Sequence, residues 1–436
     1  MISGQVDIKE ERKNVLEHKT PDKPVSCVII GAGQRGRVYA GYAEDHPAEW
    51  QVVGVADPVE LRRGQMAEEH GISDENQFAD WKAVFDRPRF ADVAVISTSD
   101  NLHYEPAIAA LKKGYDLLLE KPVAQSTEQC LEILRVAEAN GCVVTVAHVL
   151  RYTPYFRKMK EIIDSGKIGD IVSVQHLEPI GVEHFAQSYV RGNWGNTKHS
   201  NPLLLSKSCH DLDILRWLIG KPCERVSSFG SLSLFKKENA PAGVPMRCTD
   251  GCPVEKRCPH SAFRVFIEKK SYPFVGYLNV EDETNDDMIL EKLKTGPYGR
   301  CVYHCDNDVA DHQVVNMEFE GGITVAFSME ALTSYHYRRT RIMGTLGDIV
   351  GDGHVLKTSS FVTEKEEEWD VRDHMSEEAL LGHGGGDQAI VKDLVQAVSQ
   401  SNPDFLSSTL KVSIESHRMG FKAEESRLNK GRVVEL

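Results

Sequence analysis

The short segment GAGQRG, which follows the apolar run VSCVII, most constrains the fold of this chain. Its glycines are Gly31, Gly33 and Gly36, and a helical pattern begins near Arg37. A second apolar run, WQVVGVADP, ends in Asp57, which lies 21 residues after Gly36. A strand, a glycine-rich turn, a helix and a second strand that ends in an acidic residue are typical of a dinucleotide-binding βαβ unit. The alternative, an ordinary glycine turn, would not require the rest of this pattern.

The three glycines have different expected roles at the end of the first strand. Gly31 allows a tight turn, Gly33 lets the backbone approach a pyrophosphate, and Gly36 lets the helix pack closely on the strand. The helix presents its free N–H groups and its positive dipole end to the phosphates. We therefore expect a cofactor site that also includes Gln34 and Arg35, which follow Gly33 directly.

Asp57 bears on the choice between the two nicotinamide cofactors. Its carboxylate can accept hydrogen bonds from both ribose hydroxyls of NAD, and its charge would repel the 2′-phosphate of NADP. Arg62 and Arg63 follow closely and would soften that repulsion. The sequence therefore favours NAD, with NADP as the alternative.

The alternation of strand and helix continues to about residue 150. ADVAVISTS (91–99), YDLLLEKP and CVVTVAH have the character of buried strands, and helical patterns lie between them. Strict alternation predicts an α/β fold with a doubly wound parallel sheet. Ligands bind such sheets at the carboxyl ends of the strands. The residues expected at that edge, as cofactor contacts, are Ser97, Thr98, Asn101, His103, Glu120 and Lys121.

Composition excludes several classes of partner. The 436 residues include 51 basic and 65 acidic side chains, which gives a net charge of −14 and argues against nucleic acid as a partner. No apolar run is long enough to span a bilayer, so no membrane partner is expected. Residues 1–24 have the character of a polar tail without the apolar segment of a secretory signal. We expect a cytoplasmic protein whose ten cysteines are mostly reduced.

The chain resembles the Gfo/Idh/MocA oxidoreductase family in four segments: GAGQRGR, TSDNLHYEPAIAALKKGYDLLLEKP, RYTPYFRKMKEIIDSGKIGDI and LLLSKSCHDLDILRWLIG. The resemblance implies a Rossmann domain over 25–150 and an α+β domain over 151–436 with an open, mostly antiparallel sheet. It implies an NAD(P)-dependent enzyme that acts on a secondary alcohol of a sugar, inositol or related polyol. The exposed face of the second sheet would be a subunit contact, so a homodimer or homotetramer is expected.

The resemblance places the lysine of the Glu-Lys-Pro segment beside the nicotinamide and the reacting hydroxyl, which makes Lys121 the expected catalytic residue. A lysine that is half-buried near cationic or apolar groups can have a lowered pKa and serve as a base. Even when charged, it can stabilise a developing oxyanion. The resemblance also implies a cis bond between Lys121 and Pro122. The alternative is a solvated lysine at a strand end.

His210 is the second expected catalytic residue, because the resemblance implies that it works with Lys121 on the substrate hydroxyl. The family often carries an aspartate four residues before this histidine, where the present chain has Ser206 followed by Lys207. A serine can only hydrogen-bond, so the usual proton relay is in question. Either Lys207 or Asp213 compensates, or the chemistry differs.

Other residues fit contacts to the substrate. Arg151 and Tyr152 follow the last Rossmann strand and suit either substrate hydroxyls or packing at the domain hinge. Trp194 lies in the polar loop YVRGNWGNTKHSN, where an indole suits the face of a sugar or anchors a surface loop. The complete expected substrate-binding set is Lys121, Arg151, Tyr152, Trp194, Lys207, His210 and Asp213.

An insert near 240–305 gathers five of the cysteines. RCTDGCPVEKRC contains three of them and RCVYHC contains two. Thiolates this close suggest a structural zinc site, with Cys248, Cys252, Cys258 and Cys301 as ligands. The spacing Cys-x3-Cys-x5-Cys is not that of a standard zinc knuckle, so free or disulfide-paired thiols are the alternative. The thiol count also fits an iron–sulfur cluster.

Two patterns outline the rest of the second domain. HQVVNMEFEGGITVAFSMEALT alternates as two strands and predicts a hairpin that turns at 320–322. GGGDQAIVKDLVQAVSQ predicts a late amphipathic helix, and its glycines suit a loop better than a second phosphate site.

These features leave three classes of function. The leading hypothesis is a dehydrogenase of a sugar or polyol hydroxyl. The alternative is a glycosidase that uses tightly bound NAD⁺ in a cycle of oxidation, elimination and reduction, without net NADH. A cofactor-binding sensor or scaffold would not need Lys121 and His210, and their presence argues against it.

Overall fold

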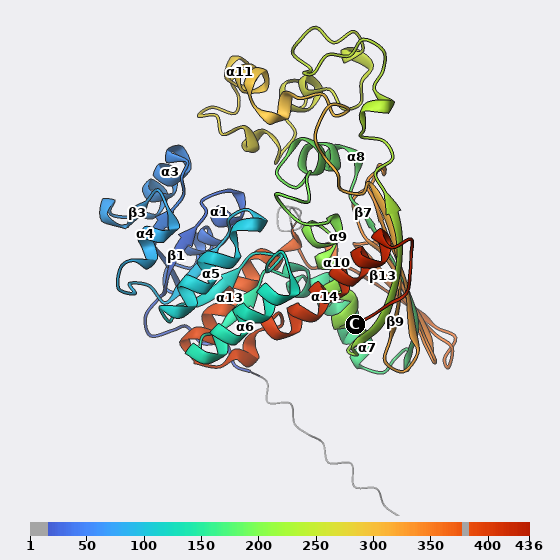
Figure 1. The fold of residues 1–436 in the computed structure, drawn as a ribbon. Helices are drawn as coiled ribbons and strands as arrows, with labels where there is room; N and C mark the ends of the chain where they lie inside the picture. Colours follow the sequence, from blue (N-terminus) through green and yellow to red (C-terminus); the bar gives the residue numbers. More distant parts are fainter. Residues whose placement is uncertain (1–15, 377–382) are drawn as a thin grey trace, which may run out of the picture.

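The computed structural model describes residues 16–376 and 383–436, which form two sheets with their covering helices (Figure 1). The first sheet has six parallel strands in the order β3-β2-β1-β4-β5-β6. They are β1 (Val25–Ile30), β2 (Trp50–Ala56), β3 (Gln77–Phe78), β4 (Val93–Ile96), β5 (Asp116–Leu119) and β6 (Val144–Val146). The predicted doubly wound α/β domain is confirmed.

Helices cover both faces of this sheet because its strands are apolar on both sides. Cys27 and Ile29 of β1 belong to one hydrophobic cluster, and Val28 and Ile30 belong to the other. The helices of this part of the chain are α1 (Gln34–Ala40), α2 (Tyr42–Asp45), α3 (Glu60–His70), α4 (Trp81–Phe85), α5 (Tyr104–Lys112) and α6 (Thr127–Asn140).

The second sheet has nine strands in the order β14-β13-β12-β11-β7-β10-β9-β8-β15. Only β7 and β10 pair in parallel, so the predicted mostly antiparallel sheet is confirmed. The strands are β7 (Ile171–Pro179), β8 (Cys223–Ser231), β9 (His312–Phe319), β10 (Ile323–Glu330), β11 (Arg339–Gly344), β12 (Gly347–Gly351), β13 (Val355–Ser360), β14 (Glu366–Asp370) and β15 (Val434–Glu435). The predicted hairpin is β9–β10, in which Phe319 pairs with Ile323.

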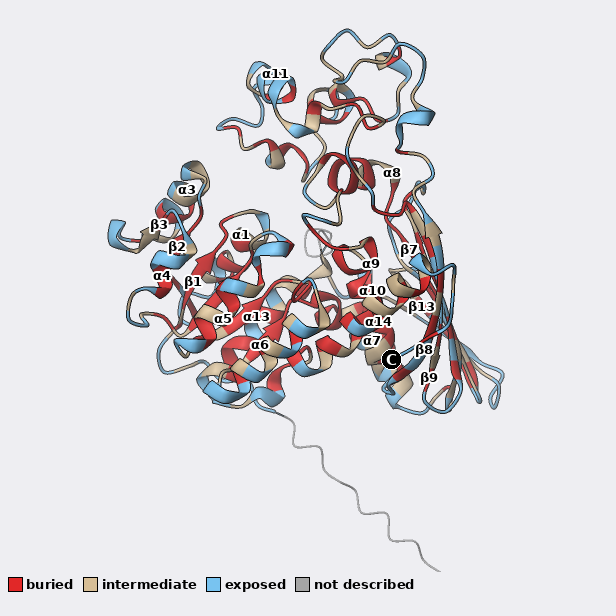
Figure 2. Ribbon diagram, in the orientation of Figure 1, coloured by how far each residue is buried: buried red, intermediate tan, exposed pale blue. Residues whose placement is uncertain are grey.

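One face of the second sheet packs on helices, and the other face stays exposed (Figure 2). The remaining helices are α7 (Pro154–Asp164), α8 (Val182–Phe185), α9 (Leu203–Ser206), α10 (Cys209–Ile219), α11 (Asp286–Thr295), α13 (Gly386–Ser399) and α14 (Leu410–Leu428). The main core of this domain joins buried residues of α7, α10 and α14 to the inner side of the strands. No helix of the described residues is both long enough and apolar enough to cross a bilayer.

The last two long helices return to the first domain. Ile390 and Leu394 of α13 pack in one cluster of the Rossmann sheet, and Leu410 and Ile414 of α14 pack in the other. Figure 1 shows α13 and α14 lying along the first domain beside α6. The segment 151–436, which the sequence assigns to the second domain, therefore supplies helices to both sheets.

The insert between β8 and β9 forms a small core of its own. It stands beyond α8 at one end of the second sheet (Figure 1), and Phe266, Ile289 and Leu293 lie in its core. The insert also reaches the first domain, because Arg62 Nε of α3 donates a hydrogen bond of 2.7 Å to Asn279 Oδ1.

A buried ion pair joins the segment after β6 to α10. Arg151 Nε and Nη2 each donate to the Asp213 carboxylate over 2.6 Å, and Nη1 donates to the Ser407 carbonyl. Both side chains are almost fully buried. Removing one member of such a pair leaves an uncompensated charge in the interior.

We expect Arg151→Leu to destabilise the fold by about 3–5 kcal/mol, because the Asp213 carboxylate would remain buried without its cation. Thermal unfolding followed by circular dichroism measures the effect. Arg157→Leu is the matched control, since its pair with Asp393 is half-exposed and should contribute about 1 kcal/mol or less. Equal melting temperatures of the two variants would contradict the prediction.

Candidate functional site

The glycine-rich loop between β1 and α1 fits the geometry that its sequence predicts. Gly31 has φ +98°, and a Cβ there would lie 2.7 Å from the Ser97 carbonyl oxygen. A Cβ on Gly36 would lie 2.1 Å from the Gly31 carbonyl oxygen. A Cβ on Gly33 would meet only Arg62 Nη1, at 3.7 Å. Packing therefore requires glycine at positions 31 and 36, and Gly33 leaves open space beside the loop.

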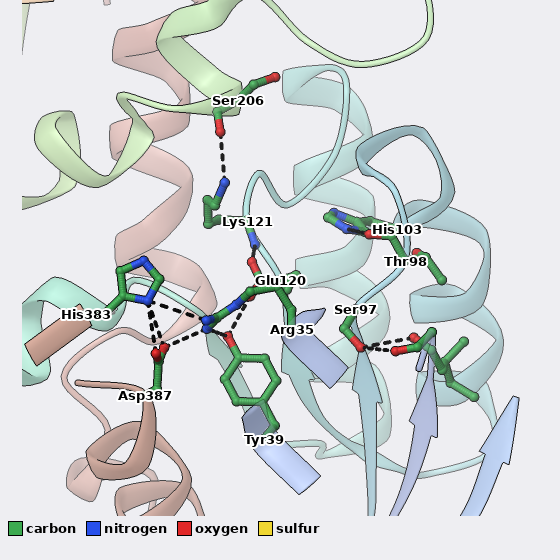
Figure 3. Close-up of polar contacts among 12 residues, drawn as sticks. Arg35, Tyr39, Ser97, Thr98, His103, Glu120, Lys121, Ser206, His383 and Asp387 are labelled. Carbon is green, nitrogen blue, oxygen red and sulfur yellow. Dashed lines mark hydrogen bonds and ion pairs between the residues drawn. The ribbon is translucent and has the colours of Figure 1, made fainter. Parts of the chain in front are cut away.

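Asp57 and Ser97 fix this loop to the neighbouring strand ends. The Asp57 carboxylate is buried and accepts 2.8 Å hydrogen bonds from the backbone N–H groups of Ala32 and Val59. Ser97 Oγ donates to the Gly31 carbonyl over 2.8 Å (Figure 3). The acid predicted to bind ribose is thus also an anchor of the glycine-rich loop.

The other residues predicted to bind the cofactor divide into exposed and internally bonded groups. Gln34 and Asn101 are exposed. Thr98 Oγ1 donates to the Leu102 carbonyl over 2.8 Å. The buried His103 ring lies between two carbonyl oxygens, with Nδ1 2.7 Å from that of Pro122 and Nε2 3.0 Å from that of Thr98.

Glu120 lies at the centre of a polar network behind Lys121 (Figure 3). Its Oε1 accepts 2.6 Å hydrogen bonds from Arg35 Nε and Tyr39 Oη, and its Oε2 accepts from the Lys121 N–H at 2.9 Å. Arg35 Nη2 also forms a 2.7 Å ion pair with Asp387 of α13. Burial raises the pKa of Glu120, but the charges of Arg35 and Lys121 more than offset it and hold the pKa below its usual value.

Lys121 follows β5 and is joined to Pro122 by a cis peptide bond, as expected. Its side chain leaves the first domain and reaches the second (Figure 3). Nζ donates to the Ser206 carbonyl over 2.8 Å and lies 5.9 Å from the centre of the Trp194 ring. The candidate catalytic amine therefore lies at the junction of the two domains.

Asp100 is a functional candidate that sequence reasoning missed. Its buried carboxylate accepts hydrogen bonds from Trp194 Nε1 at 2.8 Å, Ser200 Oγ at 2.9 Å and Ser206 Oγ at 3.1 Å. The carboxylate expected at position 206 thus has a counterpart beside Ser206, supplied by the first domain. Its position four residues after the end of β4, within TSDNLH, was the available signal.

His210 lies on α10 in a cluster of imidazoles near Lys121. Its Nδ1 is buried and has no hydrogen-bond partner within the described residues. Burial, with the nearby Lys121 charge, holds the pKa of His210 well below 6.5. The rings of His148 and His383 each lie 6.0 Å from the His210 ring. Burial likewise holds the pKa of His148 well below 6.5.

His148, His383 and Asp387 were not among the predicted site residues. His148 follows β6 in the sequence VAHVL, so its position at a strand end could have been predicted. His383 lies three residues before α13 and Asp387 lies in its first turn. They had no such signal, because only the return of that helix brings them to Arg35.

Four residues of the expected substrate-binding set have internal partners. Arg151 and Asp213 form the ion pair described above, and the buried Tyr152 hydroxyl lies 2.9 Å from Ser408 Oγ. Lys207 Nζ pairs with Glu178 at 3.3 Å. Their role toward a substrate stays a prediction, and the contacts show a structural role for each.

The insert brings together the four cysteines that the sequence proposed as metal ligands. Cys248, Cys252, Cys258 and Cys301 line one cavity of about 20 Å³, while Cys305 does not line it. All ten cysteines are free thiols. Over residues 16–376 and 383–436, no group of three or more His, Cys, Asp or Glu side chains could hold a single metal ion.

Comparison with characterised proteins gives the family. The profile described as "Oxidoreductase family, NAD-binding Rossmann fold" (Gfo/Idh/MocA) matches residues 25–148, and that for its "C-terminal alpha/beta domain" matches 160–434. The chain is 25% identical over 314 residues to the putative oxidoreductase YteT of Bacillus subtilis, covering 70% of this chain and 72% of that protein.

Two further relatives align over about half of each protein. The scyllo-inositol 2-dehydrogenase (NAD(+)) of Bacillus subtilis is 28% identical, over 50% of this chain and 59% of that protein. The 2,7-anhydro-N-acetylneuraminate hydratase of Mediterraneibacter gnavus is 27% identical, over 48% of this chain and 53% of that protein.

A solved structure shares the fold over nearly the whole chain. It is an inositol dehydrogenase homologue from Azotobacter vinelandii, complexed with NAD⁺. The two superpose with a TM-score of 0.69 at 15% identity, covering 96% of this chain and 99% of the other. With the family profiles matching both domains, the chain belongs to the Gfo/Idh/MocA oxidoreductase family.

Proposed function

We propose that the protein is an NAD-dependent dehydrogenase that transfers a hydride between the nicotinamide and a secondary alcohol of a sugar, inositol or related polyol. The observation that carries this proposal is the placement of Lys121. Its Nζ leaves the dinucleotide-binding domain and meets Ser206 and Trp194 of the other domain, close to the buried His210.

The residues present fit a bound dinucleotide. The glycine-rich loop would hold the pyrophosphate, Asp57 would accept from the ribose, and NAD would supply the hydride acceptor. Asp57 favours NAD, while Arg62 beside Gly33 is the feature that keeps NADP as an alternative.

The chain's own groups would handle the hydroxyl proton. We assign Lys121 Nζ to the proton of the reacting hydroxyl, or to the charge that develops on its oxygen. His210 is held neutral, so its ring can accept or share that proton. Trp194 would offer an apolar ring face to a sugar or cyclitol.

Two further parts of the proposal concern the assembly of the protein and its compartment. The outer face of the second sheet exposes Val172, Phe229 and Val314, and we propose it as the contact of a homodimer or homotetramer. The absence of disulfides among the ten cysteines supports a reducing, cytoplasmic compartment.

A second candidate is a reaction without net redox change, such as the predicted glycosidase cycle with bound NAD⁺. The observation that favours it is the similarity to 2,7-anhydro-N-acetylneuraminate hydratase, since a hydratase adds water and leaves the oxidation state of its substrate unchanged. The same site would serve both reactions.

The deciding experiment follows reduced nicotinamide by absorbance, with purified protein, NAD⁺ and a panel of sugars, inositols, anhydro sugars and aryl glycosides. NADH that rises in proportion to one polyol supports the dehydrogenase and names its substrate class. Cleavage or hydration of a sugar without NADH supports the second candidate. Absence of both reactions and of NAD binding would contradict the proposal.

Lys121→Ala should lower kcat by at least about 100-fold, the usual scale for a general acid or base. Steady-state kinetics with the substrate found above would measure it. Lys113→Ala is the control, because this exposed lysine precedes the N-terminal end of β5, whereas Lys121 follows its C-terminal end, and it donates to the Arg87 carbonyl. Near-wild-type turnover of Lys121→Ala would refute the catalytic role.

Asp57→Ala should lower the selectivity for NAD over NADP by about 10-fold or more, because a charge-assisted contact to the ribose and the repulsion of a 2′-phosphate are both lost. The measurement is the ratio of kcat/KM for NAD to kcat/KM for NADP. A loosened glycine-rich loop would lower both values, whereas the loss of ribose recognition changes their ratio. Asp45→Ala, an exposed carboxylate of the same domain, should leave the ratio unchanged. Unchanged selectivity of Asp57→Ala would rule out the ribose role.

The pH dependence tests the buried state of His210. Because its pKa is held well below 6.5, the ring stays neutral as pH falls to about 6, and its protonation should cause no loss of kcat/KM between pH 6 and 8. His210→Gln should lower kcat by about 100-fold yet keep the same profile in this range. A wild-type acid limb near pH 6.5 that disappears in His210→Gln would contradict the burial argument.

A further inference from the structure

The insert between β8 and β9 contacts α3 beside the glycine-rich loop. Arg62 Nε donates a 2.7 Å hydrogen bond to Asn279 Oδ1 of the insert. Nη1 of the same guanidinium lies 3.7 Å from the point where a Cβ on Gly33 would lie. Gly33 is the position at which the backbone of a dinucleotide-binding loop approaches the pyrophosphate. One arginine therefore joins the insert to the expected phosphate site.

The charge of Arg62 is not neutralised by a carboxylate of the protein. No ion pair of Arg62 occurs within residues 16–376 and 383–436. The next residue, Arg63, lies at the expected ribose contact instead, because its Nη1 donates to the Asp57 carbonyl over 2.7 Å. A guanidinium can donate to two phosphate oxygens at once. The place of Arg62 beside Gly33 therefore suits the pyrophosphate better than a 2′-phosphate.

The insert holds Asn279 in a fixed position. Its neighbours Leu278 and Val280 are both buried in the core of the insert. Asn279 has φ +52°, in the left-handed region that asparagine adopts more readily than most residues. Its Nδ2 donates to the Tyr277 carbonyl over 3.2 Å, which leaves Oδ1 as the acceptor for Arg62. The insert thus supplies a preorganised acceptor that determines where the guanidinium lies.

A row of aromatic rings joins this contact to the lysine site. Burial raises the pKa of Tyr298, and the nearby positive charge of Arg62 counteracts that rise, so Tyr298 lies at the Arg62 end of the row. The successive pairs, with ring centres 5.8 or 5.9 Å apart, are Tyr298–Tyr277, Tyr277–Phe274, Phe274–His184, His184–Tyr189 and Tyr189–Trp194. Trp194 lies against Lys121. The row therefore runs from the expected phosphate position to the expected nicotinamide position.

We propose that the insert is a clasp on the bound dinucleotide, in which Asn279 holds the Arg62 guanidinium against the pyrophosphate. The inference rests on the proposed binding of NAD. With the pyrophosphate held between the glycine-rich loop and Arg62, release of the cofactor requires Arg62 to move away from Asn279. The clasp therefore slows the dissociation of the dinucleotide. Asn279 is a positioning residue, since it acts on the cofactor through Arg62.

The test measures binding of NADH to the full chain without a substrate, so that it does not depend on the reaction. The fall in NADH fluorescence on displacement by excess NAD⁺ gives the dissociation rate, and calorimetry gives Kd for NAD⁺ and for NADP⁺. Arg62→Leu and Asn279→Gly should each raise the NADH dissociation rate and the Kd for NAD⁺ about 10-fold, because a charge-assisted contact is lost or loosened. The change to glycine removes the Asn279 side chain and tolerates the left-handed backbone.

A control and a double variant separate the clasp from a general loosening of the fold. Ser401→Gly is the matched control, because this exposed residue also has a left-handed backbone, with φ +49°. It should release NADH at the wild-type rate. The double variant Arg62→Leu/Asn279→Gly should release NADH no faster than Arg62→Leu alone, since Asn279 acts through Arg62. Additive effects of the two changes would overturn the positioning role.

The other outcomes distinguish the clasp from the proposed function. Unchanged NADH release in both single variants would overturn the clasp and leave the proposed dehydrogenase standing. Weaker binding of NADP⁺ with unchanged binding of NAD⁺ would overturn the clasp in favour of a 2′-phosphate contact by Arg62. Failure of the wild type to bind NADH would overturn both the clasp and the proposed function.

Discussion

The buried Glu120 carboxylate is the group on which the rest of the site depends. It holds Arg35 and Tyr39 of α1 and the backbone of Lys121, while Arg35 continues to Asp387 on α13. Burying a carboxylate is costly, and these donors offset the cost with several short contacts. One side chain therefore fixes α1 relative to the turn that carries Lys121, and α13 joins the same network through Asp387.

Residues of the second domain surround the side chain of Lys121, which the first domain supplies. Lys121 reaches Ser206 and Trp194, and the Asp100 carboxylate accepts a hydrogen bond from the side chain of each. The amine contacts the second domain, and the two residues that it meets there are held by a carboxylate of the first domain. In the proposed reaction Asp100 would supply the negative charge beside Ser206, because a serine alone cannot carry the charge that an aspartate would.

The insert between β8 and β9 contacts the first domain and the segment near the lysine site. It packs a small core of its own, touches α3 through Asn279 and Arg62, and presents four thiols around a cavity beside Arg191. The segment that begins at this arginine continues to Trp194 at the lysine. The insert therefore contacts, at Arg191, the same short segment whose Trp194 lies beside Lys121.

The sequence by itself determined the parts that depend on local pattern. The strand–glycine–helix order predicted the parallel sheet, alternation predicted the β9–β10 hairpin, and Glu120 and Lys121 were expected at a strand end. Only the tertiary structure decided which side chains meet across long separations, such as Arg35 with Asp387, 352 residues away. The same holds for Asp100 beside Ser206 and for the internal pairing of Arg151 with Asp213. Local sequence preferences determine each helix and strand. Contacts between distant residues depend instead on how the helices and strands pack, which cannot be derived from the spacing of residues along the chain.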